Sequence, residues 1–201
     1  MGNKQSGKKG IKKGFYEVSA PLTATKIHLY ASAPEDLDGK KIKIDLTKSL
    51  RGKSLVLKMK IKNTGGNLSA IPEELDLAGS YIRRAMRKGI DYAEDSFETE
   101  ARDAIVRVKP LMATRRKVSR AVLNALRINA KKQLISHLKT RDSEEIFSEI
   151  ISNKIQKILS QKLKKIYPLA LCEIRTLKVI KFIEKTSKKE NEEKSDSEKK
   201  E

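Results

Sequence analysis

The stretch Lys164-Lys-Ile-Tyr-Pro-Leu169, followed by Glu173-Ile-Arg-Thr-Leu-Lys-Val179, decides the fold of the last third of the chain. Pro168 lacks a backbone N–H and clashes with a preceding helical turn, so it marks the end of a helix. The basic and β-branched residues after it predict a strand from about Leu169 to Ile183. The apolar residues of this strand change phase near Thr176, which indicates a β-bulge there.

A helix over 142–167 is predicted before this strand. Asp142 and Glu145 have the spacing of a capping box, in which the two side chains satisfy the free N–H groups of the first turn. Lysines fill the last turn, where they suit the negative end of the helix dipole. The apolar residues that recur at helical spacing are Ile146, Phe147, Ile150, Ile151, Ile155, Ile158, Leu159, Leu163 and Ile166.

The segment 15–71 predicts β structure. A short strand opens at Phe15 and ends at Pro21, and a second alternation follows from Ile42 to Leu46. Leu55, Leu57, Met59 and Ile61 then alternate with Lys58, Lys60 and Lys62. The Gly-rich sequence over 63–67 predicts a hairpin with a loop of about three to five residues. The lysine face of this hairpin is either covered by an anionic partner or solvated at a sheet edge, and both interpretations stay open.

The middle of the chain predicts a helix, a β region and a second helix. The first helix spans 75–89, with Asp76 as its cap and Gly89 at its end. The β region spans about 91–112 and is interrupted by Pro110. The second helix spans 115–139, within a segment from Ala104 to Arg141 that has eleven Lys or Arg and no acidic residue. Its expected core face is Val118, Ala121, Val122, Ala125, Leu126 and Ile128, and its expected basic face is Arg116, Arg120, Arg127 and Lys131.

The composition predicts a polyanionic partner. The net charge is +19 over 201 residues, and 35% of the residues are charged. Such an excess repels itself in a compact fold, so nucleic acid is the expected partner. The predicted fold class is α+β, with an antiparallel or mixed β-barrel-like core and peripheral helices. The predicted organisation is a disordered basic arm over 1–14, a single α+β RNA-binding domain over 15–183 and a disordered charged tail over 185–201.

Motifs for catalysis or metal binding are absent from the sequence. Cys172 is the single cysteine, and the two histidines stand apart from it, so no zinc site and no cofactor is expected. No apolar run is long enough for a transmembrane helix. Asp91, Glu94 and Asp95 could form the carboxylate cluster of a metal-dependent nuclease, but a solvated acidic patch explains them better. We therefore expect no enzyme, and the alternatives are a structural RNA-binding protein and a free RNA-binding regulator or RNA chaperone.

Several segments, in the right order, resemble one family. Phe15-Tyr16 with Ala20-Pro21 is similar to its aromatic-Tyr…Ala-Pro opening, and Ile166-Tyr-Pro-Leu169 with Arg175 is similar to its Ile-Tyr-Pro-Leu…Val-Arg-Lys end. Ala113-Thr-Arg-Arg-Lys117 stands where the family has Phe-Thr followed by basic residues. The chain resembles the small-subunit ribosomal proteins of archaea and eukaryotes called S-three-a, or eS-one. Arg102-Asp103 departs from the Asp-Gly turn of that family.

The resemblance implies a structural constituent of the small ribosomal subunit, on its platform side near the messenger exit. The implied partners are small-subunit rRNA near its 3′ end and neighbouring platform proteins, without membrane or small-molecule substrate. The implied location is the ribosomes of the cytoplasm, with nucleolar assembly in a eukaryote. Few aromatics are present, so phosphate and shape recognition is expected rather than base stacking. The predicted RNA-binding residues are Lys8, Lys9, Lys12, Lys13, Lys58, Lys60, Arg115, Arg116, Lys117, Arg120, Arg127, Lys131, Arg175 and Lys178.

Overall fold

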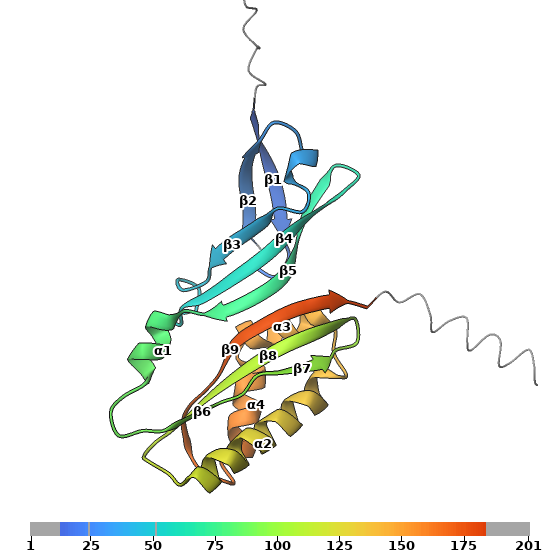
Figure 1. Cartoon of the computed structure of the whole chain (residues 1–201). Coiled ribbons are helices and arrows are strands. Elements are labelled where there is room, and N and C mark those ends of the chain that lie inside the picture. The colour runs from blue at the N-terminus through green and yellow to red at the C-terminus, as the bar shows by residue number, and fades with distance from the viewer. Residues whose placement is uncertain (1–12, 24, 51, 184–201) are drawn as a thin grey trace, which may run out of the picture. The chain divides into compact units, whose positions relative to one another are not determined.

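The computed structural model describes residues 13–23, 25–50 and 52–183 (Figure 1). Backbone contacts divide the chain into two compact units. Unit 1 comprises Met1–Lys43 and Lys58–Pro72, and unit 2 comprises Ile44–Leu57 and Glu73–Glu201. The predicted arm and tail fall largely outside the described residues, although Gly14 of the arm already begins the first strand.

Unit 1 is built around a two-stranded ribbon. Strand β1 (Gly14–Ala20) pairs antiparallel with β2 (Thr25–Ala31), and β1 also pairs in parallel with β5 (Asn67–Leu77) at Ser19 and Ser69. Alternate residues point to opposite faces, so Val18 and Ala20 are buried while their neighbours are exposed. The predicted opening strand, which ends before Pro21, is confirmed.

A long hairpin contributes residues to both units. Strand β4 (Leu55–Thr64) is joined to β5 (Asn67–Leu77) by Gly65 and Gly66, and β3 (Lys41–Asp45) pairs with β4. The predicted hairpin is confirmed, but its loop has two residues rather than three to five. Both glycines have positive φ, 59° and 94°, which is the backbone of the tight turn that matches strand twist.

The helix predicted over 75–89 is wrong in its extent. β5 continues to Leu77, and Asp76 lies opposite Thr176 of β9 (Leu169–Phe182) instead of capping a helix. The helix observed there, α1 (Gly79–Ala85), has seven residues and buries none of them. Pairing with a distant strand therefore outweighs the helical spacing of the local sequence, because the strand buries Leu75 and Leu77.

Three strands form the predicted β region of unit 2. These are β6 (Tyr92–Glu94), β7 (Phe97–Glu100) and β8 (Ala104–Thr114), and β8 pairs antiparallel with β9 (Leu169–Phe182) along its whole length. The interruption expected at Pro110 is a local shift in the pairing, and β8 continues through it to Thr114. The pairing shifts beside Pro110, so that Arg175 of β9 has no partner on β8. This extra residue is the bulge that was expected near Thr176, and it accommodates the missing N–H of the proline.

Helix α2 (Arg120–Leu138) starts five residues later than predicted. Its buried residues are Leu126, Ala130, Leu134 and Leu138. The expected core face is therefore wrong at Ala121 and Ile128, which are exposed, whereas Val122 and Ala125 are half-buried. A spacing of four residues rotates the buried stripe around the helix, so the face that meets the core changes along α2.

The helix predicted over 142–167 is broken into two. α3 (Ser143–Ile151) and α4 (Lys154–Leu163) are separated by Asn153, whose φ of 59° is left-handed. Asparagine is one of the few residues that adopt this conformation readily. The break lets both helices bury apolar side chains, including Phe147 on α3 and Leu159 on α4. α3 and α4 contact β9, and α2 contacts β6 and β7.

The capping box predicted at the start of α3 does not form. Asp142 holds the cap position but makes no side-chain capping bond. Asp103, 40 residues before Ser143, supplies the acceptors instead. The Ser143 N–H donates to Asp103 Oδ1 at 2.7 Å, and the Ser143 hydroxyl donates to Oδ2 at 2.5 Å. The β7–β8 turn thus fixes the start of α3. These elements confirm an α+β fold with a mixed sheet and peripheral helices.

We predict that Asp103→Ala destabilises the protein by about 1–3 kcal/mol, because Ser143 is buried and would lose both acceptors. Glu145→Gln is the control, since Glu145 is exposed and the capping box that would use it is absent. Urea unfolding followed by circular dichroism measures both variants. An Asp103→Ala protein as stable as the control would contradict the assigned cap.

We also predict that 15–183 unfolds as a single domain. β4 and β5 supply residues to both units, so neither unit can lose these strands without breaking the other. Calorimetry should give one transition, with equal calorimetric and van't Hoff enthalpies. Two separable transitions would show that the units are independent domains.

Candidate nucleic-acid interface

The loop between β8 and α2 is held at both ends by hydrogen bonds. Thr114, at the end of β8, is fully buried, and its Oγ1 accepts a hydrogen bond from the Asp91 N–H at 3.1 Å. The same hydroxyl can donate to the carbonyl oxygens of Asp91 and Arg116, at 2.8 and 2.7 Å. Beyond the loop, the Val118 N–H donates to Asp91 Oδ2 at 2.9 Å. The backbone of 115–117 is therefore pinned between two fixed points.

Three consecutive cations leave this pinned loop toward solvent. Arg115, Arg116 and Lys117 are exposed, and none forms an ion pair with another described residue. The first turn of α2 has no acidic residue to neutralise them. Arg120 and Arg127 are also exposed and lie two turns apart on one face of α2. We call these five residues the basic loop–helix surface.

Lys131 lies one turn beyond Arg127 on α2. Its ammonium nitrogen is 5.6 Å from the centroid of the Phe97 ring on β7. A cation at this distance is attracted by the face of the ring, which restrains an exposed side chain. Lys131 therefore extends the positive charge of α2 toward β7.

Two predicted cations of β9 have acidic neighbours. Arg175, the bulged residue, forms two hydrogen bonds of 3.0 Å from Nη1 to the two carboxylate oxygens of Glu94. Lys178 stands in a cross-strand row in which two adjacent cations lie between two acids, in the order Glu98, Arg107, Lys178 and Glu74. Arg107 of this row bonds Glu98 at 2.5 Å. The role of Arg175 and Lys178 in RNA binding stays a prediction. Acids lie beside both residues, so the net charge around them is lower than that of the basic loop–helix surface.

The remaining predicted cations belong to unit 1. Lys60 of β4 is exposed and Lys58 is half-buried. The ammonium group of Lys13 lies 6.0 Å from the centroid of the Tyr30 ring. Lys8, Lys9 and Lys12 lie outside the described residues, so their role also stays a prediction.

Sequence reasoning missed a further basic group around α1. The segment from Leu77 to Ile90 has four cations and no acid, and α1 buries no side chain in unit 2. The cations are Arg83, Arg84, Arg87 and Lys88, all exposed. The cluster is visible in the sequence. In the longer helix predicted there, these cations would lie at the C-terminal end, where a favourable interaction with the helix dipole accounts for them without RNA.

The three carboxylates considered for a nuclease serve the fold. Asp91 fixes the loop before α2, and Glu94 binds Arg175. Asp95 Oδ1 accepts the N–H of Ser96 at 2.8 Å. Within the described ranges, His, Cys, Asp and Glu form no group of three or more that could hold a metal ion.

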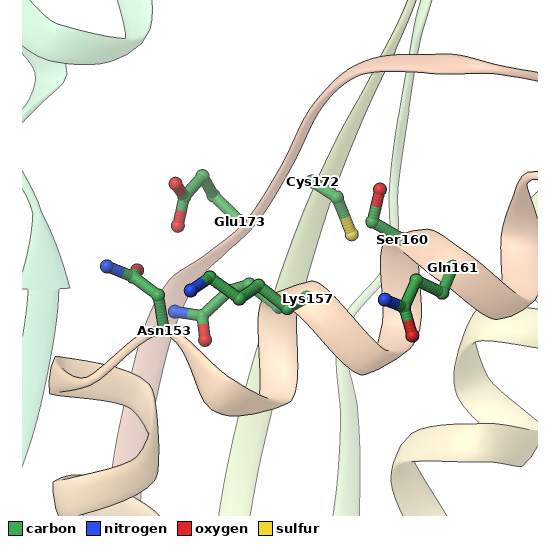
Figure 2. Close-up of a pocket in the computed structure, with 7 residues that line it drawn as sticks. Asn153, Lys157, Ser160, Gln161, Cys172 and Glu173 are labelled. Carbon is green, nitrogen blue, oxygen red and sulfur yellow. The ribbon is translucent and has the colours of Figure 1, made fainter.

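An open pocket of about 450 Å³ lies between α4 and β9 in unit 2 (Figure 2). Figure 2 shows Lys157, Ser160 and Gln161 on α4 and Cys172 and Glu173 on β9. Burial raises the pKa of the Cys172 thiol to about 12, and the adjacent Glu173 carboxylate adds to the shift. The thiol is therefore protonated at neutral pH, so the pocket offers hydrogen bonds rather than an activated sulfur nucleophile.

An ion pair closes one side of this pocket. Lys53 Nζ lies 2.5 Å from Glu173 Oε2 and 2.5 Å from Asn153 Oδ1. The two charged side chains are only 9% and 12% exposed. A buried ammonium must be paired, and here it ties the β3–β4 connection to β9 and to the break between α3 and α4. This cluster is structural, and it holds the side chain of Asn153 at the break between the two helices.

We predict that Cys172 alkylates on the order of a hundredfold more slowly in the folded protein than in guanidinium at pH 8.5, because little thiolate exists in the fold. The folded pKa is above the ordinary value of 9.0, so the associated stability is present below pH 9 and is lost as pH rises toward 12. Iodoacetamide labelling followed by mass spectrometry measures the rates, with Cys172→Ser as the blank. Equal rates in the two states would contradict the buried, protonated thiol.

No helix in 13–23, 25–50 or 52–183 is long and apolar enough to span a membrane.

Comparison with known proteins gives one consistent family. The small ribosomal subunit protein eS1 of Pyrobaculum aerophilum is 29% identical over 141 residues, which cover 69% of this chain and 63% of that protein. The protein of the same name from Nanoarchaeum equitans is 25% identical over 172 residues, covering 82% of this chain and 87% of that protein. The chain thus spans less than two thirds of the Pyrobaculum relative. The model of the Ribosomal S3Ae family matches residues 2–182, nearly the whole chain, and this chain belongs to that family.

Proposed function

We propose that this chain is a structural protein of the small ribosomal subunit and that it binds folded rRNA through phosphate contacts. The observation that carries the proposal is the pinned loop, in which Thr114 and Asp91 fix the backbone that carries three adjacent exposed cations. A fixed backbone has less conformational freedom to lose when the cations meet phosphates, and the cations gain affinity by releasing counterions. The names of the relatives, small ribosomal subunit protein eS1, support the ribosomal assignment.

The basic loop–helix surface has the chemistry that phosphate binding requires. Arginine presents a planar fork of N–H donors that matches two phosphate oxygens, which lysine cannot do. Arg116, Arg120 and Arg127 contribute three such forks along the loop and one helix face. We propose that these arginines follow successive phosphates of a folded RNA and recognise its shape rather than its sequence.

The proposal extends to the other predicted cations. Lys13, Lys58, Lys60 and the lysines of the N-terminal arm would contact rRNA from unit 1, and Lys131, Arg175 and Lys178 from unit 2. The exposed cations Arg83, Arg84, Arg87 and Lys88 around α1 join them, because no side chain of α1 is fully buried in its own unit. As the family resemblance implies, we place the protein on the platform side near the messenger exit, against rRNA near its 3′ end and neighbouring platform proteins.

A free RNA-binding regulator or RNA chaperone would share the same cations, so location in the cell separates it from a ribosomal protein. Tagged protein should sediment with small subunits on a sucrose gradient and stay with them in moderate salt. Sedimentation with free RNA alone would favour the regulator.

We predict that changing Arg115, Arg116 and Lys117 together to Gln flattens the slope of log K against log salt for small-subunit rRNA by about two to three units. The melting temperature should hardly change, since these side chains are exposed and form no ion pair with described residues. Filter binding at several salt concentrations measures the slope.

The control is Arg107→Gln, which removes a cation already paired with Glu98. It should change the slope by less than one unit. If the triple variant keeps the wild-type affinity, slope and incorporation into subunits, the loop is only a solvated surface and the proposed site is wrong.

A further inference from the structure

The ribbon of unit 1 exposes two aromatic rings side by side. Phe15 of β1 and Tyr30 of β2 are directly opposite each other in the strand register, and they are 75% and 58% exposed. Their ring centroids are 5.1 Å apart, with the ring planes tilted by 48°. Large exposed aromatics are uncommon because they leave much apolar surface in water. Two of the nine aromatic residues of the chain are placed together in this way.

The other face of the same ribbon supplies its packing. Val18, Ala20 and Ala31 are buried on that face, so the ribbon is held without Phe15 or Tyr30. The strand alternation puts Phe15 and Tyr30 on the face that contributes nothing to the core of unit 1. The ring pair is therefore available for a partner.

The charges around the rings favour an anionic partner. Lys13 places its ammonium 6.0 Å from the centroid of the Tyr30 ring. Glu17, the acid on this face, is bonded to Lys26 at 2.6 Å, which neutralises it. His28 lies opposite Glu17 and is exposed. The aromatic face thus has a cation at one end and no uncompensated acid among its described residues.

We propose that Phe15 and Tyr30 form a stacking platform for an unpaired nucleobase of RNA. A base presents a flat π-face to the more exposed Phe15 ring, while Lys13 meets a phosphate next to it. The Tyr30 hydroxyl makes no hydrogen bond with other described residues and can bond a base edge or a ribose hydroxyl. This inference builds on the proposed rRNA binding, but it concerns unit 1 and a different chemistry, stacking instead of phosphate contact.

The test uses a short single-stranded oligoribonucleotide that carries one 2-aminopurine, whose fluorescence falls when it stacks on an aromatic ring. The full chain should quench this probe. Phe15→Leu with Tyr30→Leu keeps apolar side chains but removes both π-faces, and it should abolish the quenching and weaken binding by about tenfold or more. The salt slope should stay the same, because no charge is removed.

A second variant keeps the proposal testable if the double Leu protein folds poorly. The chain has no tryptophan, so Phe15→Trp introduces a single reporter at the platform and preserves a stacking surface. Its emission should be quenched by the oligonucleotide, and much less by an abasic ribose-phosphate chain of the same length, which offers phosphates but no base to stack. Equal quenching by both, or none by either, would overturn the stacking platform.

Two controls separate this inference from the proposed function. The Arg115, Arg116 and Lys117 triple variant should still quench 2-aminopurine, even where its affinity for folded rRNA falls. Failure of rRNA binding with intact quenching would reject the proposed interface alone. If the double Leu variant keeps probe quenching but fails to enter small subunits, the rings meet a protein neighbour and the base-stacking proposal is wrong.

Discussion

The antiparallel pairing of β8 with β9 is the constraint on which unit 2 depends. It brings Val108 opposite Leu177 and Met112 opposite Cys172, and it gives α3 and α4 a strand to pack on. The pairing accommodates Pro110 because Arg175 is an extra, unpaired residue of β9 at this point. The extra residue keeps the buried residues of both strands on the same face of the sheet. The end of β8 delivers Thr114 to Asp91, so the basic loop is a direct continuation of this pairing.

The sequence predicts those elements whose cause is local. Alternation of apolar and charged residues over a few positions predicts β3, β4 and β9, and Gly65-Gly66 predicts the hairpin. The break between α3 and α4 is different, because helical spacing continues across it. It lies at Asn153, whose side chain accepts a hydrogen bond from Lys53, 100 residues away in the chain. No window of sequence contains that contact, and the same holds for the cap that Asp103 gives to Ser143.

The candidate site likewise has features that depend on local sequence and features that depend on distant residues. Clusters of Lys and Arg are visible in the sequence, so the cations of the basic loop–helix surface could be named without a structure. Whether a cation is already neutralised is a non-local question, as Arg175 and Glu94, 81 residues apart, demonstrate. Asp91 is an acid near the cations that does not neutralise them. Its carboxylate accepts the backbone N–H of Val118 and so orders the loop that carries the cations. The sequence thus identifies the candidate cations, and only the fold shows which of them are already paired with an acid.

The low aromatic content of the chain argues against base stacking only if the aromatic residues are spread evenly over the protein. The register of β1 against β2 places two of them opposite each other on the face that the core does not use, and a one-residue slip would have buried them. The same register sets Glu17 beside Lys26, which removes the negative charge that would repel a phosphate. The two proposed recognition chemistries are therefore compatible in one small protein, with phosphate contacts proposed for the pinned loop of unit 2 and base stacking proposed for the ribbon of unit 1. In each case strand pairing fixes the backbone from which the side chains project.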